Sequence, residues 1–234
     1  MTAPRKKVFI GGLPSSGTTV FVQTLWEFGF AQGPTYGDNF EGLFDPACPD
    51  VLKYHENQEP VWRHVAQFEP EDAEVVRAWI DSYDGGSGCF MEKSPPHLTK
   101  FQALQQLYGD DAYFIVMQRD PLQVIRSRKK RNPGLSSTVA TLFLRQTLHF
   151  HTQWRHDLGN FLYLRYEDFC EQPGRVLDEV FAFLGLPQPG EKVAAVCAKM
   201  EIWLKHRHED WPDFKPQVFY LAGVLANEWG YDAF

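Results

Sequence analysis

The segment from residue 8 to residue 19 constrains the fold of this chain more than any other stretch of its sequence. A short apolar run at residues 8–10 precedes glycine-rich residues 11–17, and apolar side chains then recur at helical spacing over residues 20–28. This pattern predicts a buried strand, a tight loop and a helix. Such a loop directs several backbone N–H groups toward one point at the positive end of a helix, where phosphate or a similar anion binds.

The spacing of residues 12–19 is close to that of the nucleoside-triphosphate loop, G-x-x-x-x-G-K-[ST], but Thr18 stands where that loop has its lysine. The missing lysine normally reaches the outer phosphates, so its absence argues against a kinase or an ATPase. A P-loop kinase of small molecules is kept as the alternative enzyme. A generic strand-to-helix turn is the alternative without a ligand.

Two later strands are also predicted to end in polar residues. Residues 89–92 read as a short strand before Lys93, and residues 112–118 form a nearly continuous apolar strand before Arg119. In parallel α/β sheets the carboxyl ends of the strands form the ligand-binding edge. A guanidinium at Arg119 and a hydroxyl at Ser127, two helical turns later, suit a phosphate monoester.

The loop resembles the 5′-phosphosulfate loop of sulfotransferases, the enzymes that use 3′-phosphoadenosine 5′-phosphosulfate (PAPS). Their loop commonly reads Pro, then Lys or Arg, then Ser-Gly-Thr-Thr. This chain matches it at Pro14, Ser16, Gly17, Thr18 and Thr19, whereas Ser15 takes the place of the basic residue.

Three further segments carry the same resemblance. The order Glu-Lys-Ser-Pro at residues 92–95 resembles a segment of glycan and bacterial sulfotransferases in which the Lys lies beside the transferred group. Arg119 and Ser127 resemble the pair that contacts the 3′-phosphate of PAPS. The order Arg-Tyr-Glu-Asp at residues 165–168 makes Tyr166 the expected neighbour of the adenine. The chain lacks the Gly-x-x-Gly-x-x-Lys motif of cytosolic members, which favours the glycan, tyrosylprotein and bacterial branch.

The resemblance implies an α/β fold, a three-layer α/β/α arrangement with a central parallel sheet and P-loop-like nucleotide-binding architecture. It implies transfer of a sulfonate from PAPS to a hydroxyl or amine by in-line displacement, with 3′-phosphoadenosine 5′-phosphate (PAP) as product and no metal. The expected donor-binding residues are Pro14, Ser15, Ser16, Gly17, Thr18, Thr19, Arg119, Ser127 and Tyr166.

The expected catalytic residues follow from the charge that must be stabilised and the proton that must be removed. Lys93 is the first candidate to neutralise charge on the leaving oxygen, because the loop itself has no cation. Asp38, Glu41 and His97 are the candidate bases for the acceptor proton. Five of the six residues 126–131 are basic, and they form either a solvated helix end or extra charge around the nucleotide or an anionic acceptor.

The whole chain of 234 residues is expected to form one sulfotransferase-like domain, residues 1–234, in which residues 30–90 carry a substrate or lid region. Its formal net charge of −7 argues against a nucleic-acid partner and favours a small-molecule or saccharide acceptor. The sequence shows no signal peptide or membrane span, and its four cysteines are widely separated. These features predict a cytoplasmic protein without a membrane partner. A non-catalytic nucleotide-binding protein derived from a sulfotransferase is the alternative from another class, with Ser15 as its best support.

Overall fold

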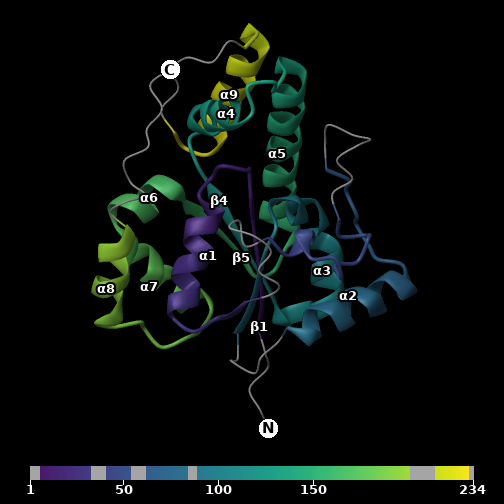
Figure 1. Ribbon diagram of the computed structural model, residues 1–234, viewed down its shortest axis with the longest axis vertical. Coiled ribbons are helices and arrows are strands. Elements are labelled where there is room, and N and C mark those ends of the chain that lie inside the picture. The colour runs from purple at the N-terminus through teal and green to yellow at the C-terminus, as the bar shows by residue number, and fades with distance from the viewer. Residues whose placement is uncertain (1–5, 33–40, 54–61, 84–88, 201–213, 232–234) are drawn as a thin grey trace.

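The structure is a computed structural model, and it describes residues 6–32, 41–53, 62–83, 89–200 and 214–231 (Figure 1). The candidate base Asp38 lies outside these ranges, as do residues 33–40, 54–61 and 84–88 of the expected substrate or lid region.

A five-stranded sheet forms the centre of the molecule, and its strands follow the order β2-β3-β1-β4-β5. Every paired strand is parallel. In the central strand, Ile10 pairs with Lys93 of β3, and Gly12 pairs with Met117 of β4, so the carboxyl ends of these strands lie along one edge. The strands are β1 (Lys6–Gly12), β2 (Ala31–Gln32), β3 (Cys89–Lys93), β4 (Ala112–Gln118) and β5 (Phe161–Arg165).

Alternate residues of the sheet face two separate hydrophobic clusters, as the twofold period of a strand requires. Val8 and Ile10 of β1 face the first cluster, whereas Phe9 faces the second. The first cluster includes side chains of α1 (Thr18–Glu27), α6 (Tyr166–Glu171) and α7 (Pro173–Phe183), with α8 (Lys192–Met200) packed beside them. The second includes side chains of α2 (Pro70–Ser82), α3 (Phe101–Tyr108) and α5 (Ser137–Asp157).

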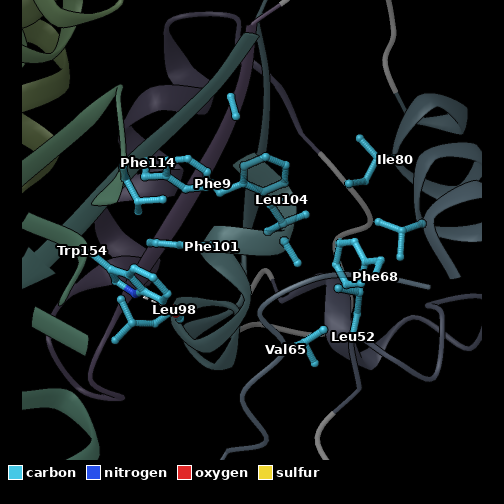
Figure 2. Packing of buried hydrophobic residues seen from close by; sticks show 14 of the residues in the cluster. Phe9, Leu52, Val65, Phe68, Ile80, Leu98, Phe101, Leu104, Phe114 and Trp154 are labelled. Carbon is cyan, nitrogen blue, oxygen red and sulfur yellow. Dashed lines mark hydrogen bonds between the residues drawn. The ribbon is translucent and has the colours of Figure 1, made fainter. Parts of the chain in front are cut away.

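Aromatic rings fill the second cluster close to the sheet (Figure 2). The ring centroid of Phe114 lies 5.8 Å from that of Phe9 and 4.6 Å from that of Phe101. Trp154 of α5 is fully buried, and its indole Nε1 donates a hydrogen bond of 2.8 Å to the Leu98 carbonyl oxygen. Helices therefore cover both faces of a parallel sheet, which confirms the predicted three-layer arrangement.

A third cluster lies beyond the carboxyl ends of the strands, where α4 (Pro121–Arg131) packs against α5 and α9 (Pro216–Glu228) (Figure 1). The Asp120 side chain caps α4 by accepting a hydrogen bond of 2.8 Å from the Leu122 backbone N–H. Pro121 occupies the first turn, where its missing N–H needs no partner. The cap and the cluster hold α4 at the functional edge of the sheet.

Several short elements were not anticipated. One is a 3-10 helix, η3 (Pro95–Lys100), which leads directly into α3. Its first turn is closed by a hydrogen bond of 2.8 Å from the His97 N–H to the Ser94 carbonyl oxygen, three residues back, since two consecutive prolines supply no N–H. The other unanticipated elements are strand β2, helix α6 and the 3-10 helices η2 (Gly42–Phe44) and η4 (Gly109–Asp111).

Candidate functional site

The loop after β1 turns sharply through three residues with positive φ: Gly12 at 147°, Ser15 at 77° and Gly17 at 89°. Ser16 is fully buried, and its N–H and its hydroxyl both donate to the Leu13 carbonyl oxygen, at 3.0 and 2.6 Å. Helix α1 follows directly and has no side-chain cap within the described residues. The first N–H groups of a helix have no intrahelical acceptor, so this end of α1 is suited to bind an anion.

Tyr166 lies directly against the loop. A Cβ built on Gly17 would come within 2.1 Å of the Tyr166 ring, so only glycine permits this contact. The guanidinium carbon of Arg119 lies 4.7 Å from the centroid of the same ring, and Arg119 Nη1 donates a hydrogen bond of 2.9 Å to the Ser15 carbonyl oxygen. Burial raises the pKa of the Tyr166 hydroxyl, which therefore stays neutral. Loop, ring and guanidinium form one packed unit.

Gly17→Ala is expected to lower stability more than Gly29→Ala, although both residues have φ of 89°. A Cβ at Gly29 meets no atom within 4 Å, so that variant is expected to lose only about 1–2 kcal/mol through backbone strain. Gly17→Ala adds the clash with Tyr166, and overpacking of this kind costs about 1–3 kcal/mol more. Denaturant unfolding of the two variants measures the difference, and equal midpoints would contradict the contact.

Lys93 links the loop to the other side of the site. It shares a side of β3 with Cys89 and Met91, which face α1, and its fully buried side chain reaches Thr19 in the first turn of that helix. Lys93 Nζ lies 3.1 Å from Thr19 Oγ1 and 3.0 Å from Glu41 Oε1. Burial lowers the pKa of Lys93, and the neighbouring Glu41 carboxylate opposes part of that shift.

Glu92 points to the opposite side of β3 and organises a buried network there. Its Oε2 lies 2.6 Å from His97 Nδ1, and its Oε1 accepts a hydrogen bond of 2.5 Å from Ser94 Oγ. Ser94 Oγ in turn accepts one of 3.1 Å from the Leu43 backbone N–H. His97 is 1% exposed, and its Nε2 has no hydrogen-bond partner in the described part of the chain. The network attaches the residues that follow Glu41 to the end of β3.

These elements surround a cleft of about 530 Å³ at the carboxyl edge of the sheet. Its volume lies in the range of small-molecule sites. The lining residues are Pro14, Ser15, Gly17, Thr18, Thr19, Val20, Glu41, Pro95, Arg119, Ser127, Lys130, Arg131 and Tyr166.

Most of the residues singled out from the sequence thus line one cleft. Among those that the structure describes, three do not: Ser16 and His97 are buried and do not line it, and Lys93 is buried but contacts Thr19 and Glu41, which line it. The sequence analysis left open whether the basic residues 126–131 serve the site. Lys130 and Arg131 line the cleft, and their spacing of three and four residues from Ser127 on one helix is a signal that could have identified them.

Among the described residues, no group of three or more His, Cys, Asp or Glu side chains is arranged to hold a metal ion. In the same part of the chain, no helix is both long enough and apolar enough to cross a bilayer.

Comparison with solved structures finds the same fold in several sulfotransferases. Sulfotransferase STF9 from Mycobacterium avium superposes with a TM-score of 0.59 at 16% identity, covering 99% of this chain and 78% of that one. The sulfotransferase domain of the Synechococcus PCC 7002 olefin synthase gives 0.56 at 19% identity, covering 99% and 97%. Mouse sulfotransferase SULT7A1, solved in complex with PAP, gives 0.53 at 12% identity, covering 87% and 68%. These identities establish a shared fold alone.

A search of curated proteins gives no match. The model of the sulfotransferase family, in contrast, matches residues 7–190, which include the phosphate loop, the end of β3, Arg119 and Tyr166. This match covers well over half of the chain, and it agrees with the fold and with the cleft at the carboxyl edge of the sheet. The chain therefore belongs to the sulfotransferase family.

Proposed function

We propose that this protein transfers a sulfonate group from PAPS to a hydroxyl or amine of a small-molecule or saccharide acceptor. One observation carries the proposal: the buried Lys93 ammonium contacts both Thr19, in the first turn of α1, and Glu41, and these two residues line the cleft. A cation and a carboxylate thereby meet where the anion-binding loop opens into the cleft. This is the arrangement needed to stabilise a leaving phosphate and to accept a proton nearby.

The residues present fit a donor with phosphates at two ends. The positive-φ loop and the uncapped start of α1 suit the 5′ end, where the helix supplies N–H groups and a favourable dipole. Arg119 and Ser127, only 8% and 4% exposed, suit the 3′-phosphate. Tyr166 lines the cleft and contacts both Gly17 and Arg119, and its aromatic ring suits the adenine. Mouse sulfotransferase SULT7A1, which shares this fold and was solved in complex with PAP, supports this choice of donor.

When bound, PAPS supplies the sulfonate and a phosphate leaving group, and the protein supplies charge and alignment. Lys93 holds its proton at Nζ and stabilises negative charge beside Thr19. The loop amides and the Thr18 and Thr19 hydroxyls hold the reacting end in line. Because these groups are fixed by the strand end and the helix start, little reorganisation is needed.

Of the two candidate bases within the described residues, Glu41 and His97, the geometry favours Glu41. It lines the cleft and is 3.0 Å from Lys93, with its side chain 17% exposed. His97 is buried and engaged with Glu92, so it is better suited to support the site from behind. Glu41 accepts the acceptor proton at a carboxylate oxygen, and the Lys93 charge keeps that carboxylate in place.

Calorimetric titration with PAP and then with ATP and Mg²⁺ tests the donor class. We expect PAP to bind more tightly, because the loop has no triphosphate-type lysine and Arg119 with Ser127 suits a 3′-phosphate. Transfer of labelled sulfonate from PAPS to a panel of alcohols, phenols, amines and sugars then tests the activity.

Each alternative has its own outcome in these experiments. Tighter binding of ATP with Mg²⁺ would favour the small-molecule kinase. Tight binding of PAP, with no labelled product and no release of PAP from PAPS, would favour the non-catalytic nucleotide-binding protein.

A further inference from the structure

The side chain of Glu167, the second residue of α6, joins two segments that lie far from it in the sequence. Its Oε1 accepts a hydrogen bond of 3.1 Å from the Asp120 backbone N–H, at the start of α4. Its Oε2 accepts one of 2.6 Å from the Tyr231 hydroxyl, just beyond α9. One carboxylate thereby links the start of α4 to the end of α9.

Both ends of the Glu167–Asp120 hydrogen bond adjoin residues of the cleft. Glu167 follows Tyr166 directly, and Asp120 follows Arg119 directly. The bonded N–H belongs to the planar peptide group that joins Arg119 to Asp120, so the bond fixes the backbone from which the Arg119 side chain extends. Tyr166 and Arg119 line the cleft, whereas Glu167 and Tyr231 do not.

Tyr231 is itself held in place by backbone and ring contacts. Gly230 has φ of 71°, and the Tyr231 N–H then donates a hydrogen bond of 2.9 Å to the Ala226 carbonyl oxygen, which closes the end of α9. The Tyr231 ring centroid lies 4.1 Å from the Arg165 guanidinium carbon. Burial and the neighbouring Glu167 carboxylate raise the pKa of the Tyr231 hydroxyl, which therefore keeps its proton and donates it to Glu167.

Attachment of α9 to the molecule does not depend on these hydrogen bonds. Helix α9 already packs against α4 and α5 through the third hydrophobic cluster. Apolar packing is non-directional, whereas a hydrogen bond weakens when its angle departs from linearity. The Glu167 carboxylate therefore adds a control of direction at the backbone of Arg119, where a misplacement of about 1 Å at a site can cost about 100-fold in rate.

We propose that Glu167 and Tyr231 are positioning residues that orient Arg119 for binding of the donor nucleotide. They act through the Asp120 N–H and lie outside the cleft. This inference rests on the proposed function, since it assumes that Arg119 binds the donor. It assigns to the end of α9, more than 100 residues beyond Arg119, a part in donor affinity.

Calorimetry with PAP and steady-state kinetics with PAPS test the assignment. Tyr231→Phe removes the hydroxyl and keeps the ring, and it is expected to weaken PAP binding and raise the KM for PAPS about 3- to 10-fold. Glu167→Leu removes both hydrogen bonds, and about a 10- to 100-fold loss is expected. In both variants kcat at saturating PAPS is expected to stay within about twofold, because the reacting end of the donor is untouched.

Two further variants separate positioning from charge and from general stability. Glu167→Gln is expected to restore PAP binding to within about threefold, because its amide oxygen can accept from the Asp120 N–H while its amide nitrogen donates to the Tyr231 hydroxyl oxygen. Asp168→Asn is the matched control on the same helix, since it breaks an ion pair of 3.0 Å with Arg175 that does not reach Asp120. That partly exposed pair is expected to change PAP binding less than about twofold.

A double-mutant cycle with Arg119→Gln provides a readout that a merely structural role would not give. Once the guanidinium is gone, Tyr231→Phe is expected to change PAP binding less than about twofold, because it acts on PAP through Arg119. A structural role predicts the same loss from Tyr231→Phe with and without Arg119. Tyr231→Phe keeps the test available if Glu167→Leu does not fold.

Failure of this inference can be distinguished from failure of the proposed function. If the unaltered protein does not bind PAP, the proposed function fails and this inference fails with it. If PAP binds and Arg119→Gln weakens it, but Tyr231→Phe and Glu167→Leu bind PAP as tightly as the unaltered protein, only the present assignment is overturned. Equal losses from Tyr231→Phe in the two backgrounds, or no rescue by Glu167→Gln, would likewise overturn it.

Discussion

Replacing Lys93 with methionine is expected to lower kcat about 100- to 1,000-fold, the range observed when one preorganised charge-stabilising donor is removed. Methionine keeps the length of the buried side chain, so the change removes the charge with little loss of packing. PAP affinity is expected to fall much less, because Arg119, Ser127 and the loop amides are untouched. Steady-state kinetics with PAPS and calorimetry with PAP separate the two effects.

Lys100→Met is the matched control for this variant. Lys100 is also a buried lysine beyond β3, 1% exposed, but it does not line the cleft, and its Nζ lies 3.5 Å from the Arg63 carbonyl oxygen. Burial lowers the pKa of Lys100 to about 8, so its charged form is disfavoured there and removal of the charge is expected to cost little stability. Equal kcat values for the two variants would remove the catalytic role of Lys93.

The pH dependence of kcat provides a second readout for Lys93. Burial lowers its pKa below the ordinary 10.5, so the ammonium loses its proton at a lower pH than a solvated lysine does. Since only the protonated form stabilises the leaving group, kcat is expected to fall as pH rises, with an alkaline limb below 10.5. Lys93→Met is expected to lack this limb.

Replacing Glu41 with glutamine is expected to lower kcat about 100- to 10,000-fold, the usual contribution of a general base. The amide keeps an oxygen that can accept a hydrogen bond from Lys93, so the change removes basicity with little change in shape. The loss should be larger for an aliphatic alcohol than for a phenol, because a phenol releases its proton more readily and depends less on the base. The ratio of kcat values for the two acceptor classes measures this.

An effect of Glu41→Gln that is the same for both acceptor classes would indicate a role in binding or folding. His97→Asn serves as the comparison, because His97 lies behind the cleft and contacts Glu92. It is expected to lower stability without a preference between acceptor classes. If His97→Asn discriminates between them and Glu41→Gln does not, the base is assigned to the wrong residue.

The sequence predicted the features that depend on neighbouring residues. The apolar runs at β1, β3 and β4 identified the strands, and the polar residues after them identified the edge where the cleft forms. Helix α5 (Ser137–Asp157) likewise begins directly after a capping serine, Ser136, whose side chain accepts a hydrogen bond from the Val139 N–H. These elements follow from hydrophobic period, proline and capping residues, which act locally.

Other features depend on distant segments and could not be read from the sequence. Glu41 and Lys93 are 52 residues apart, and nothing in either neighbourhood identifies one as the partner of the other. Strand β2 has only two residues, too few to show the alternation of apolar and polar residues that identifies a strand. It forms by pairing with the edge of β3. Glu92 and Lys93 point to opposite sides of β3 because successive side chains of a strand alternate. The packing of the whole sheet decides which of these two sides contacts α1.

The hydrogen bond of 3.1 Å from the Leu43 N–H to Ser94 Oγ ties the chain near Glu41 to the end of β3. It anchors the chain just after Glu41, so the segments beyond Phe44 can change in length or composition without pulling the carboxylate away from Lys93. Proteins that keep Glu92, Ser94 and His97 could therefore accept new substrates through changes in those segments. Glu41 and Lys93 would keep their positions relative to each other.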